Sequence, residues 1–170
     1  MVITKQGIAA TSQTLASQAA AQILAKGGSA VDAAIAANAV LGLVEPMMDG
    51  MGGDMFAIYW DAKSGKLTGL NGSGSAPRAL SPKFLADKGV KTMPGSGIHS
   101  VTVPGAVGGW WAMHQKFGKL PWKDLFQAAI AYADDGFPVT EAIVEEWSSP
   151  GEVRRLKADA EAGRVFLLNG

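Results

Sequence analysis

The chain has 170 residues, 48% of them hydrophobic, which is enough length and apolar content for one folded core. Lys plus Arg and Asp plus Glu each number 15, so no net charge favours nucleic acid or an anionic membrane surface. The absence of Cys excludes disulfides, thiolate metal sites and a Cys nucleophile. We expect a globular protein that binds neither nucleic acid nor membrane.

The amino-terminal residues 1–7 contain one Lys and no unbroken apolar segment, so no signal peptide is predicted. The longest apolar stretch, residues 30–44, is interrupted by Asp32 and Asn38 and is too short to span a bilayer. We therefore expect a soluble, cytoplasmic protein, or a periplasmic or secreted one if a signal peptide has been removed.

The first part of the chain predicts a strand followed by a helix. Residues 7–10 form a short apolar run typical of a buried strand, and Thr11 and Ser12 are natural helix-capping residues. Apolar residues then recur at helical spacing, and Gly27-Gly28 supplies a C-terminal stop. We expect a helix between Ser12 and Gly27.

A second helix is predicted directly after these glycines. Ser29 and Asp32 have the three-residue spacing of a capping box, and Glu45-Pro46 ends the helix. The residues between are mostly Ala, which predicts close packing on more than one side. Three glycines within residues 50–53 then indicate a sharply bent loop against the core.

A β-hairpin is predicted in the middle of the chain. Residues 55–60 and 67–70 read as its strands, and residues 61–66 as its turn. The Gly- and Ser-rich residues 71–75 must then be a loop. Ser81, followed by Pro, predicts the N-cap of a short helix.

The second half of the chain is predicted to be mainly helical. Residues 100–103 read as a further strand, and the rest follows helical spacing with polar caps. The first of four expected helices starts after Pro104-Gly105 and has Trp110, Met113, His114 and Phe117 on one face. The second carries the stripe Trp122, Phe126 and Ile130. The third extends from Thr140 to Trp147, and the fourth starts at Ser149-Pro150.

The chain shows no internal repeat, low-complexity tract or linker, so residues 1–170 are expected to form a single unit. Its pattern mixes helices with three or four short strands and lacks a regular alternation of strand and crossover helix. The predicted fold class is α+β, rich in helix.

Several motifs, in this order, are similar to the large subunit of γ-glutamyltranspeptidases. Their order and spacing carry the resemblance, which runs over nearly the whole chain. The matching segments are Ala10-Thr11-Ser12-Gln13, Gly27-Gly28-Ser29-Ala30-Val31-Asp32-Ala33-Ala34, Val44-Glu45-Pro46, Gly50-Met51-Gly52-Gly53-Asp54-Met55-Phe56, Ala76-Pro77 and Val103-Pro104-Gly105.

The resemblance implies a fold, a mechanism and a partner. The family's fold is the four-layer αββα sandwich of N-terminal-nucleophile (Ntn) hydrolases, and the precursor cuts itself so that a Thr begins the small subunit. That Thr attacks the amide carbonyl while its own α-amine takes the proton, and an acyl-enzyme results. The implied partner is the small-subunit portion with this Thr, and the implied substrate is a γ-glutamyl or related acyl amide. No catalytic residue, cofactor or metal is assigned to this chain.

The resemblance also points to substrate-binding positions. The family holds the substrate's α-carboxylate with an arginine placed either three residues or one residue before the Ala-Pro pair. In this chain those positions are Ser73 and Ser75, and the nearest guanidinium is that of Arg78. We predict Ser73, Ser75 and Arg78 as substrate-binding residues. An acyl group without an α-amino-carboxylate, such as that of a dicarboxylic monoamide, would need less of the missing arginine.

Other motifs favour structural interpretations. The glycines at residues 50–53 lack the Gly-Lys-Ser/Thr of a phosphate loop and precede a strand where a helix is required. His99 and His114 lie in different elements without ligand-like spacing, so neither is predicted to bind metal. The tandem Trp110 and Trp111 cannot both face one core, so one of them is expected at the surface or under another part of the protein.

A second functional hypothesis remains open. The chain is either a segment of a γ-glutamyltransferase-family amidohydrolase that acts together with the Thr-bearing portion, or a non-catalytic, truncated homologue that works as a binding or assembly module. In both cases the chain by itself is expected to expose apolar surface and to be marginally stable.

Overall fold

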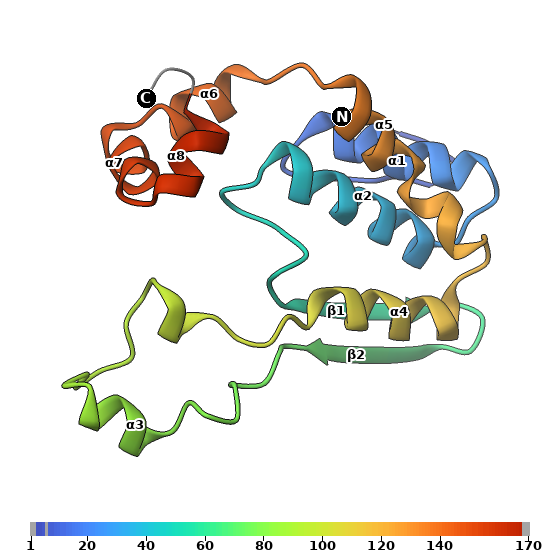
Figure 1. The fold of residues 1–170 in the computed structure, drawn as a ribbon. Helices are drawn as coiled ribbons and strands as arrows, with labels where there is room; N and C mark the ends of the chain where they lie inside the picture. The colour runs from blue at the N-terminus through green and yellow to red at the C-terminus, as the bar shows by residue number, and fades with distance from the viewer. Residues whose placement is uncertain (1–2, 6, 168–170) are drawn as a thin grey trace. The chain divides into compact units, whose positions relative to one another are not determined.

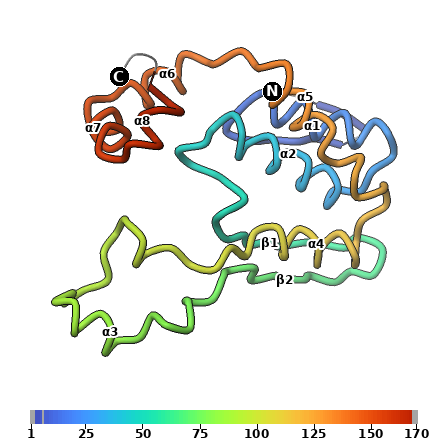
Figure 2. Tube along the Cα trace, viewed as in Figure 1, coloured from blue at the N-terminus to red at the C-terminus, as the bar shows by residue number. Residues whose placement is uncertain are grey.

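The structure, a computed structural model, describes residues 3–5 and 7–167. The chain forms two compact units, Met1–Asp134 and Asp135–Gly170, each considered by itself (Figures 1 and 2). The elements are α1 (Thr14–Ala25), α2 (Ala30–Val44), β1 (Met55–Asp61), β2 (Lys66–Gly72), α3 (Pro82–Asp87), η1 (Ile98–Ser100), α4 (Ala106–Phe117), η2 (Trp122–Phe126), α5 (Gln127–Asp135), α6 (Glu141–Trp147), α7 (Pro150–Ala158) and α8 (Ala160–Phe166).

Helix α1 begins one residue later than its predicted caps. Gln13 is the N-cap, and its side-chain oxygen accepts a hydrogen bond from the N–H of Leu15. The prediction that Thr11 and Ser12 cap the helix was wrong, because the capping hydrogen bond is accepted by Gln13. Thr11 donates to the carbonyl of Gln13, and Ser12 donates to the carboxylate of Glu45 at 2.6 Å.

Helix α2 begins with the predicted capping box. Ser29 Oγ accepts from the N–H of Asp32 at 3.1 Å, and Asp32 Oδ2 accepts from the N–H of Ser29 at 2.8 Å. Helices α1 and α2 pack against each other through small side chains, and they form the core of the first unit (Figure 1). The buried apolar residues of the pair are Ala16, Ala19, Ala20, Ile23, Val31, Ala33, Ile35, Ala36, Ala37, Val40 and Val44.

Strands β1 and β2 form the predicted antiparallel hairpin, paired from Met55 opposite Gly72 to Asp61 opposite Lys66. Helix α4 lies along the hairpin (Figure 1). Its Phe117 ring lies 4.2 Å from the ring of Tyr59, measured between centroids. A Cβ on Gly109 would clash with the Met55 side chain, which would have to move, so glycine favours this close approach.

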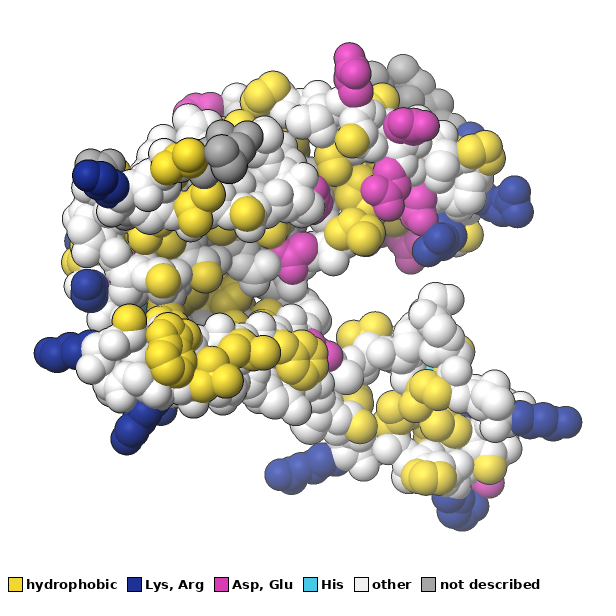
Figure 3. All heavy atoms as spheres, turned by 180° about the vertical axis from the view of Figure 1, so that it is seen from behind, with side chains coloured by type: hydrophobic (Ala, Val, Ile, Leu, Met, Phe, Trp, Pro, Cys, Tyr) yellow, Lys and Arg dark blue, Asp and Glu magenta, His cyan; other side chains and the backbone are white. Residues whose placement is uncertain are grey.

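The other face of the hairpin is exposed within the described chain. Burial alternates along β1, as expected for a strand covered on one face. Phe56, Ile58 and Trp60 of β1 are exposed by 58% or more, and Leu67 of β2 by 67%. Figure 3 shows hydrophobic side chains gathered over this part of the molecule.

Two predicted strands are absent from the part of the chain that the structure describes. Residues 7–10 are irregular, and Ile8 is 64% exposed. Residues 100–103 contain the end of η1 and an irregular segment, in which the Val101 N–H bonds back to the carbonyl of Ile98 and the Val103 N–H bonds to the carbonyl of Ser75. Both runs are apolar enough for a strand, but neither has a partner strand to satisfy its backbone groups. The expectation of three or four strands was therefore wrong for the described residues, where β1 and β2 form the sheet.

Helix α4 follows its prediction, whereas the next predicted helix is divided. Trp110 is 3% exposed and Trp111 is 48% exposed, so the tandem tryptophans face in different directions as expected. The stripe from Trp122 to Ile130 begins as the 3₁₀ helix η2, whose three-residue period makes Leu125 the buried residue. Ile130, in α5, is 49% exposed.

The second unit consists of short capped helices. Thr140 precedes α6 without a side-chain capping bond, and Ser149 caps α7 as predicted. Helix α8 was not predicted, although Asp159 caps it by accepting from the N–H of Ala162 at 2.8 Å. The helix-rich α+β class is confirmed, and no helix in the described residues is long and apolar enough to cross a membrane.

Candidate functional site

The predicted substrate loop is held by a single carboxylate. Asp54 Oδ1 accepts hydrogen bonds from the N–H of Gly74 at 2.6 Å and from Thr102 Oγ1 at 3.1 Å. Asp54 Oδ2 accepts from Ser73 Oγ at 3.2 Å. We call Asp54, Ser73, Gly74 and Thr102 the Asp54 clasp. It joins three segments that are distant in sequence: the glycine-rich loop before β1, the loop after β2 and the segment before α4.

Backbone contacts reinforce the Asp54 clasp. The carbonyl of Gly53 accepts from the N–H groups of Gly105 and Ala106, both at 3.0 Å. The N–H of Val103 donates to the carbonyl of Ser75 at 2.9 Å. These bonds fix the start of α4 on the glycine-rich loop, so the close backbone approach predicted for residues 50–53 is confirmed at Gly53.

Glycine is required at two places beside the clasp. A Cβ on Gly74 would lie 1.6 Å from the carbonyl oxygen of Val103, and a Cβ on Gly105 would lie 2.2 Å from that of Gly72. Both clashes are with backbone, which cannot move aside as a flexible side chain can. The second of these glycines belongs to the Val103-Pro104-Gly105 motif, which therefore packs closely against the loop after β2.

The three predicted site residues differ in their surroundings. Ser73 belongs to the Asp54 clasp, and its N–H donates to Asn71 Oδ1 at 2.9 Å. Ser75 is exposed, and its carbonyl is bonded to Val103. Arg78 is exposed and forms no ion pair or hydrogen bond with the described residues. The structure thus places all three on one loop and integrates only Ser73 into a polar network.

Asp54 is charged at neutral pH. Its pKa is lowered from the ordinary 3.8, chiefly by the hydrogen bond from the Gly74 N–H and further by those from Thr102 and Ser73. Sequence reasoning used Asp54 only as part of a motif and missed this role. An Asp after a glycine pair, shortly before a strand, was the available signal.

A second feature is a cavity of about 430 Å³ between α2 and β1. At its rim, Asn38 Nδ2 donates to Asp49 Oδ2 at 2.7 Å, and Trp110 Nε1 donates to Asn38 Oδ1 at 2.9 Å. Burial raises the pKa of Asp49, and the negative charge of Glu45 adds to this shift. The other lining residues are apolar except for Asp54 and Tyr59, and the contacts of Asn38 connect the elements that surround the cavity.

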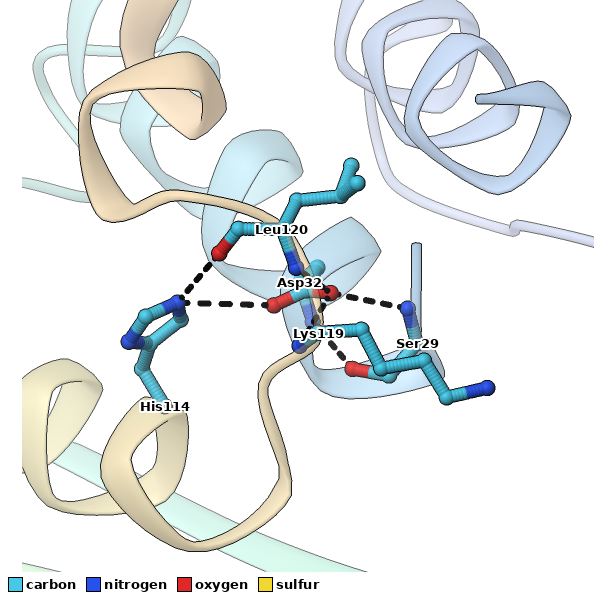
Figure 4. A network of polar contacts seen from close by, with 5 residues as sticks. All are labelled: Ser29, Asp32, His114, Lys119 and Leu120. Carbon is cyan, nitrogen blue, oxygen red and sulfur yellow. Dashed lines mark hydrogen bonds and ion pairs between the residues drawn. The ribbon is translucent and has the colours of Figure 1, made fainter. Parts of the chain in front are cut away.

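A third feature is a buried network at the start of α2 (Figure 4). Asp32 is fully buried, and its Oδ2 accepts from the N–H groups of Lys119 at 2.9 Å and Leu120 at 3.1 Å, in addition to Ser29. His114 Nε2 lies 2.9 Å from the carbonyl oxygen of Leu120 and 3.8 Å from Asp32 Oδ1. Sequence reasoning found the cap but missed its bonds to the Lys119–Leu120 turn.

Both histidines pack against aromatic side chains. His114 stacks on Trp111 and makes an edge contact with Trp122, and His99 makes an edge contact with Phe84. Within residues 3–5 and 7–167, no group of three or more His, Asp or Glu side chains is placed to hold a metal ion.

Comparison with known proteins identifies the family. The γ-glutamyltranspeptidase family model matches residues 16–170. The chain belongs to the γ-glutamyltranspeptidase family. It is 36% identical to the glutathione hydrolase proenzyme of Bacillus subtilis, over 98% of this chain and 28% of that protein. The name proenzyme implies processing of that relative.

Solved structures of similar proteins share the fold. The Helicobacter pylori γ-glutamyltranspeptidase superposes with a TM-score of 0.90 at 29% identity, covering 100% of this chain and 49% of that one. A cephalosporin acylase from Bacillus halodurans superposes with a TM-score of 0.81 at 39% identity, covering 92% of this chain and 30% of that one. The chain spans about a quarter of the length of its curated relatives.

Proposed function

We propose that this chain is the N-terminal part of the large subunit of a γ-glutamyltransferase-family amidohydrolase that cleaves γ-glutamyl or related amide bonds. The observation that carries the proposal is the Asp54 clasp. Two segments of the family motif, Gly52-Gly53-Asp54 and Val103-Pro104-Gly105, meet there on either side of the predicted substrate loop. A motif that serves only local folding would not need to bring these distant segments to one loop.

The proposed chemistry requires a residue from another portion of the protein. A Thr at the start of the small-subunit portion would attack the amide carbonyl, its α-amine would take the proton, and water or an amine would then release the acyl group. The loop with Ser73, Ser75 and Arg78 would bind the acyl group. The complete protein would adopt the four-layer Ntn sandwich, and the exposed face of the hairpin would be covered in it.

The test uses the protein made from its complete gene. Intact mass measurement and N-terminal sequencing should show two chains, the smaller beginning with Thr. A γ-glutamyl anilide should release its aniline, and replacing that Thr with Ala should abolish both self-cleavage and anilide release. A single uncleaved chain without amidase activity would contradict the proposal.

A second candidate is a non-catalytic binding or assembly module. The exposed apolar face of the hairpin, with Phe56, Ile58 and Trp60, is the observation that favours it. An uncleaved protein that self-associates through this face would support the second candidate. Measurement of the protein's molecular mass in solution distinguishes the two candidates.

A further inference from the structure

Ser73 and Gly74 have already used their hydrogen-bond donors. The N–H of Ser73 donates to Asn71 Oδ1, the hydroxyl of Ser73 donates to Asp54 Oδ2, and the N–H of Gly74 donates to Asp54 Oδ1. A fourth donor beside the loop, the hydroxyl of Thr102, also points to Asp54. No donor of Ser73 or Gly74 remains for a carboxylate of the substrate.

The acceptors of the same loop remain available. A serine hydroxyl has one proton to donate and two lone pairs that accept, so Ser73 Oγ can still accept a hydrogen bond from a ligand. Asp54 adds a full negative charge, and it is exposed to solvent and therefore to a ligand. An ammonium or N–H group fits this surface, whereas at Ser73, Gly74 and Asp54 a carboxylate finds neither a free donor nor a compensating charge.

We propose that Asp54 is a specificity-determining residue, which makes this loop select an acyl group with an ammonium or N–H donor over one with a carboxylate. The inference rests on the proposed function, because it concerns the same acyl-binding loop. The position where the family has an arginine that holds a carboxylate is here Ser73, bonded to Asp54. A negative charge beside this position therefore takes the place of the family's positive charge.

The experiment compares two substrates that differ only in the terminal group. The 4-aminobutyryl and glutaryl amides of one aniline have the same three-methylene chain and end in an ammonium and a carboxylate, respectively. With the protein made from its complete gene, kcat/KM should be roughly tenfold higher for the 4-aminobutyryl anilide, as expected for solvent-exposed charges at close range.

Variants distinguish the effect of the Asp54 charge on substrate preference from the effect of Asp54 on the structure of the loop. Asp54→Asn keeps the side-chain shape and should reduce the preference about tenfold. Asp61→Asn is the matched control, because Asp61 also accepts an exposed hydrogen bond from a serine hydroxyl, that of Ser64. It should leave the preference unchanged. The double variant Asp54→Asn with Ser73→Arg should reverse the preference toward glutaryl, which a merely damaged loop would not do.

Ligand binding gives a readout that does not need catalysis. Calorimetry with 4-aminobutyramide and with glutaramate should show tighter binding of the former, and Asp54→Asn should weaken it. If no anilide is cleaved but this binding holds, the proposed amidohydrolase function fails and the assignment of Asp54 stands. Three outcomes would overturn the assignment. The first is tighter binding or faster cleavage of the glutaryl compound, and the second is an unchanged preference in Asp54→Asn. The third is a protein that cleaves no anilide and binds neither amide.

Discussion

Asp32 accepts a hydrogen bond from the N–H of Leu120, which lies 88 positions later in the chain. The same carboxylate oxygen caps α2 through Ser29 and accepts from Lys119. The side chain is fully buried, so these bonds are shielded from water. One residue of the capping box therefore also anchors the turn between α4 and η2.

Replacing Asp32 is expected to destabilise the protein strongly. Asp32→Ala leaves one buried and two part-buried N–H groups without an acceptor, and we expect a loss of about 3 kcal/mol in the free energy of unfolding. Asp32→Asn retains one acceptor oxygen and should cost less. Urea denaturation measures both. Asp87→Ala is the control, since Asp87 is in an exposed pair with Lys83 and should change stability by less than about 1 kcal/mol. Equal effects of the two Ala variants would contradict the anchoring role.

Adding one methyl group at Gly74 should displace the substrate loop. The Cβ of Gly74→Ala would meet the Val103 carbonyl oxygen at 1.6 Å, so the loop must move and the Asp54 clasp should open. We expect faster hydrogen exchange at the amides of Gly74 and Val103, and at least a tenfold loss of kcat/KM in the active protein. Gly69→Ala is the control, because a Cβ there meets nothing within 4 Å. Unchanged exchange in Gly74→Ala would show that the clasp tolerates a Cβ.

The Asp54 clasp should respond to acid. The folded-state pKa of Asp54 is lowered below 3.8, so the folded state holds fewer protons there than the unfolded state. The clasp therefore stabilises the fold above about pH 4, and this contribution is lost as the pH falls through the lowered pKa. In an NMR titration, the Gly74 amide proton should keep its chemical shift down to about pH 4 and move below it. Asp54→Asn should remove this transition, and a midpoint above 3.8 would contradict the prediction.

Arg78 is an exposed cation on the predicted substrate loop. If it holds an anionic part of the substrate, Arg78→Ala should raise KM for a γ-glutamyl anilide about tenfold, the equivalent of one charge-assisted hydrogen bond. Steady-state kinetics on the complete protein measures this effect. Lys83→Ala, which removes another exposed cation, should leave KM unchanged. Equal KM values for Arg78→Ala and the unmodified protein would remove Arg78 from the site.

The buried face of α2 and the exposed face of the hairpin lead to a stability test. Ile35 is 3% exposed and Ile58 is 82% exposed. In the chain of residues 1–170, Ile35→Ala should cost about 2–5 kcal/mol and Ile58→Ala about 0.5 kcal/mol or less. In the protein from the complete gene, Ile58→Ala should become costly if the remaining portion covers this face. A small effect of Ile58→Ala in both would favour the uncovered module.

Local sequence patterns determined the elements that depend on nearby residues. The capping box of Ser29 and Asp32, the hairpin, the N-cap at Ser81 and helix α4 were all predicted, because turn and cap chemistry acts within a few residues. The strands predicted at residues 7–10 and 100–103 failed for the opposite reason. An apolar run becomes a strand only when another strand satisfies its backbone groups, and this condition is not local.

The order of the family's motifs in the sequence was sufficient to identify the family, since it requires no knowledge of distances. Only the tertiary structure could decide which groups meet. It places Asp54 against Ser73, Gly74 and Thr102, and it places Asp32 against the Lys119–Leu120 turn. Hydrogen bonds act over about 3 Å, so residues tens of positions apart form one only after folding has brought their elements together. The chemistry of the substrate loop therefore depends on packing that no single motif contains.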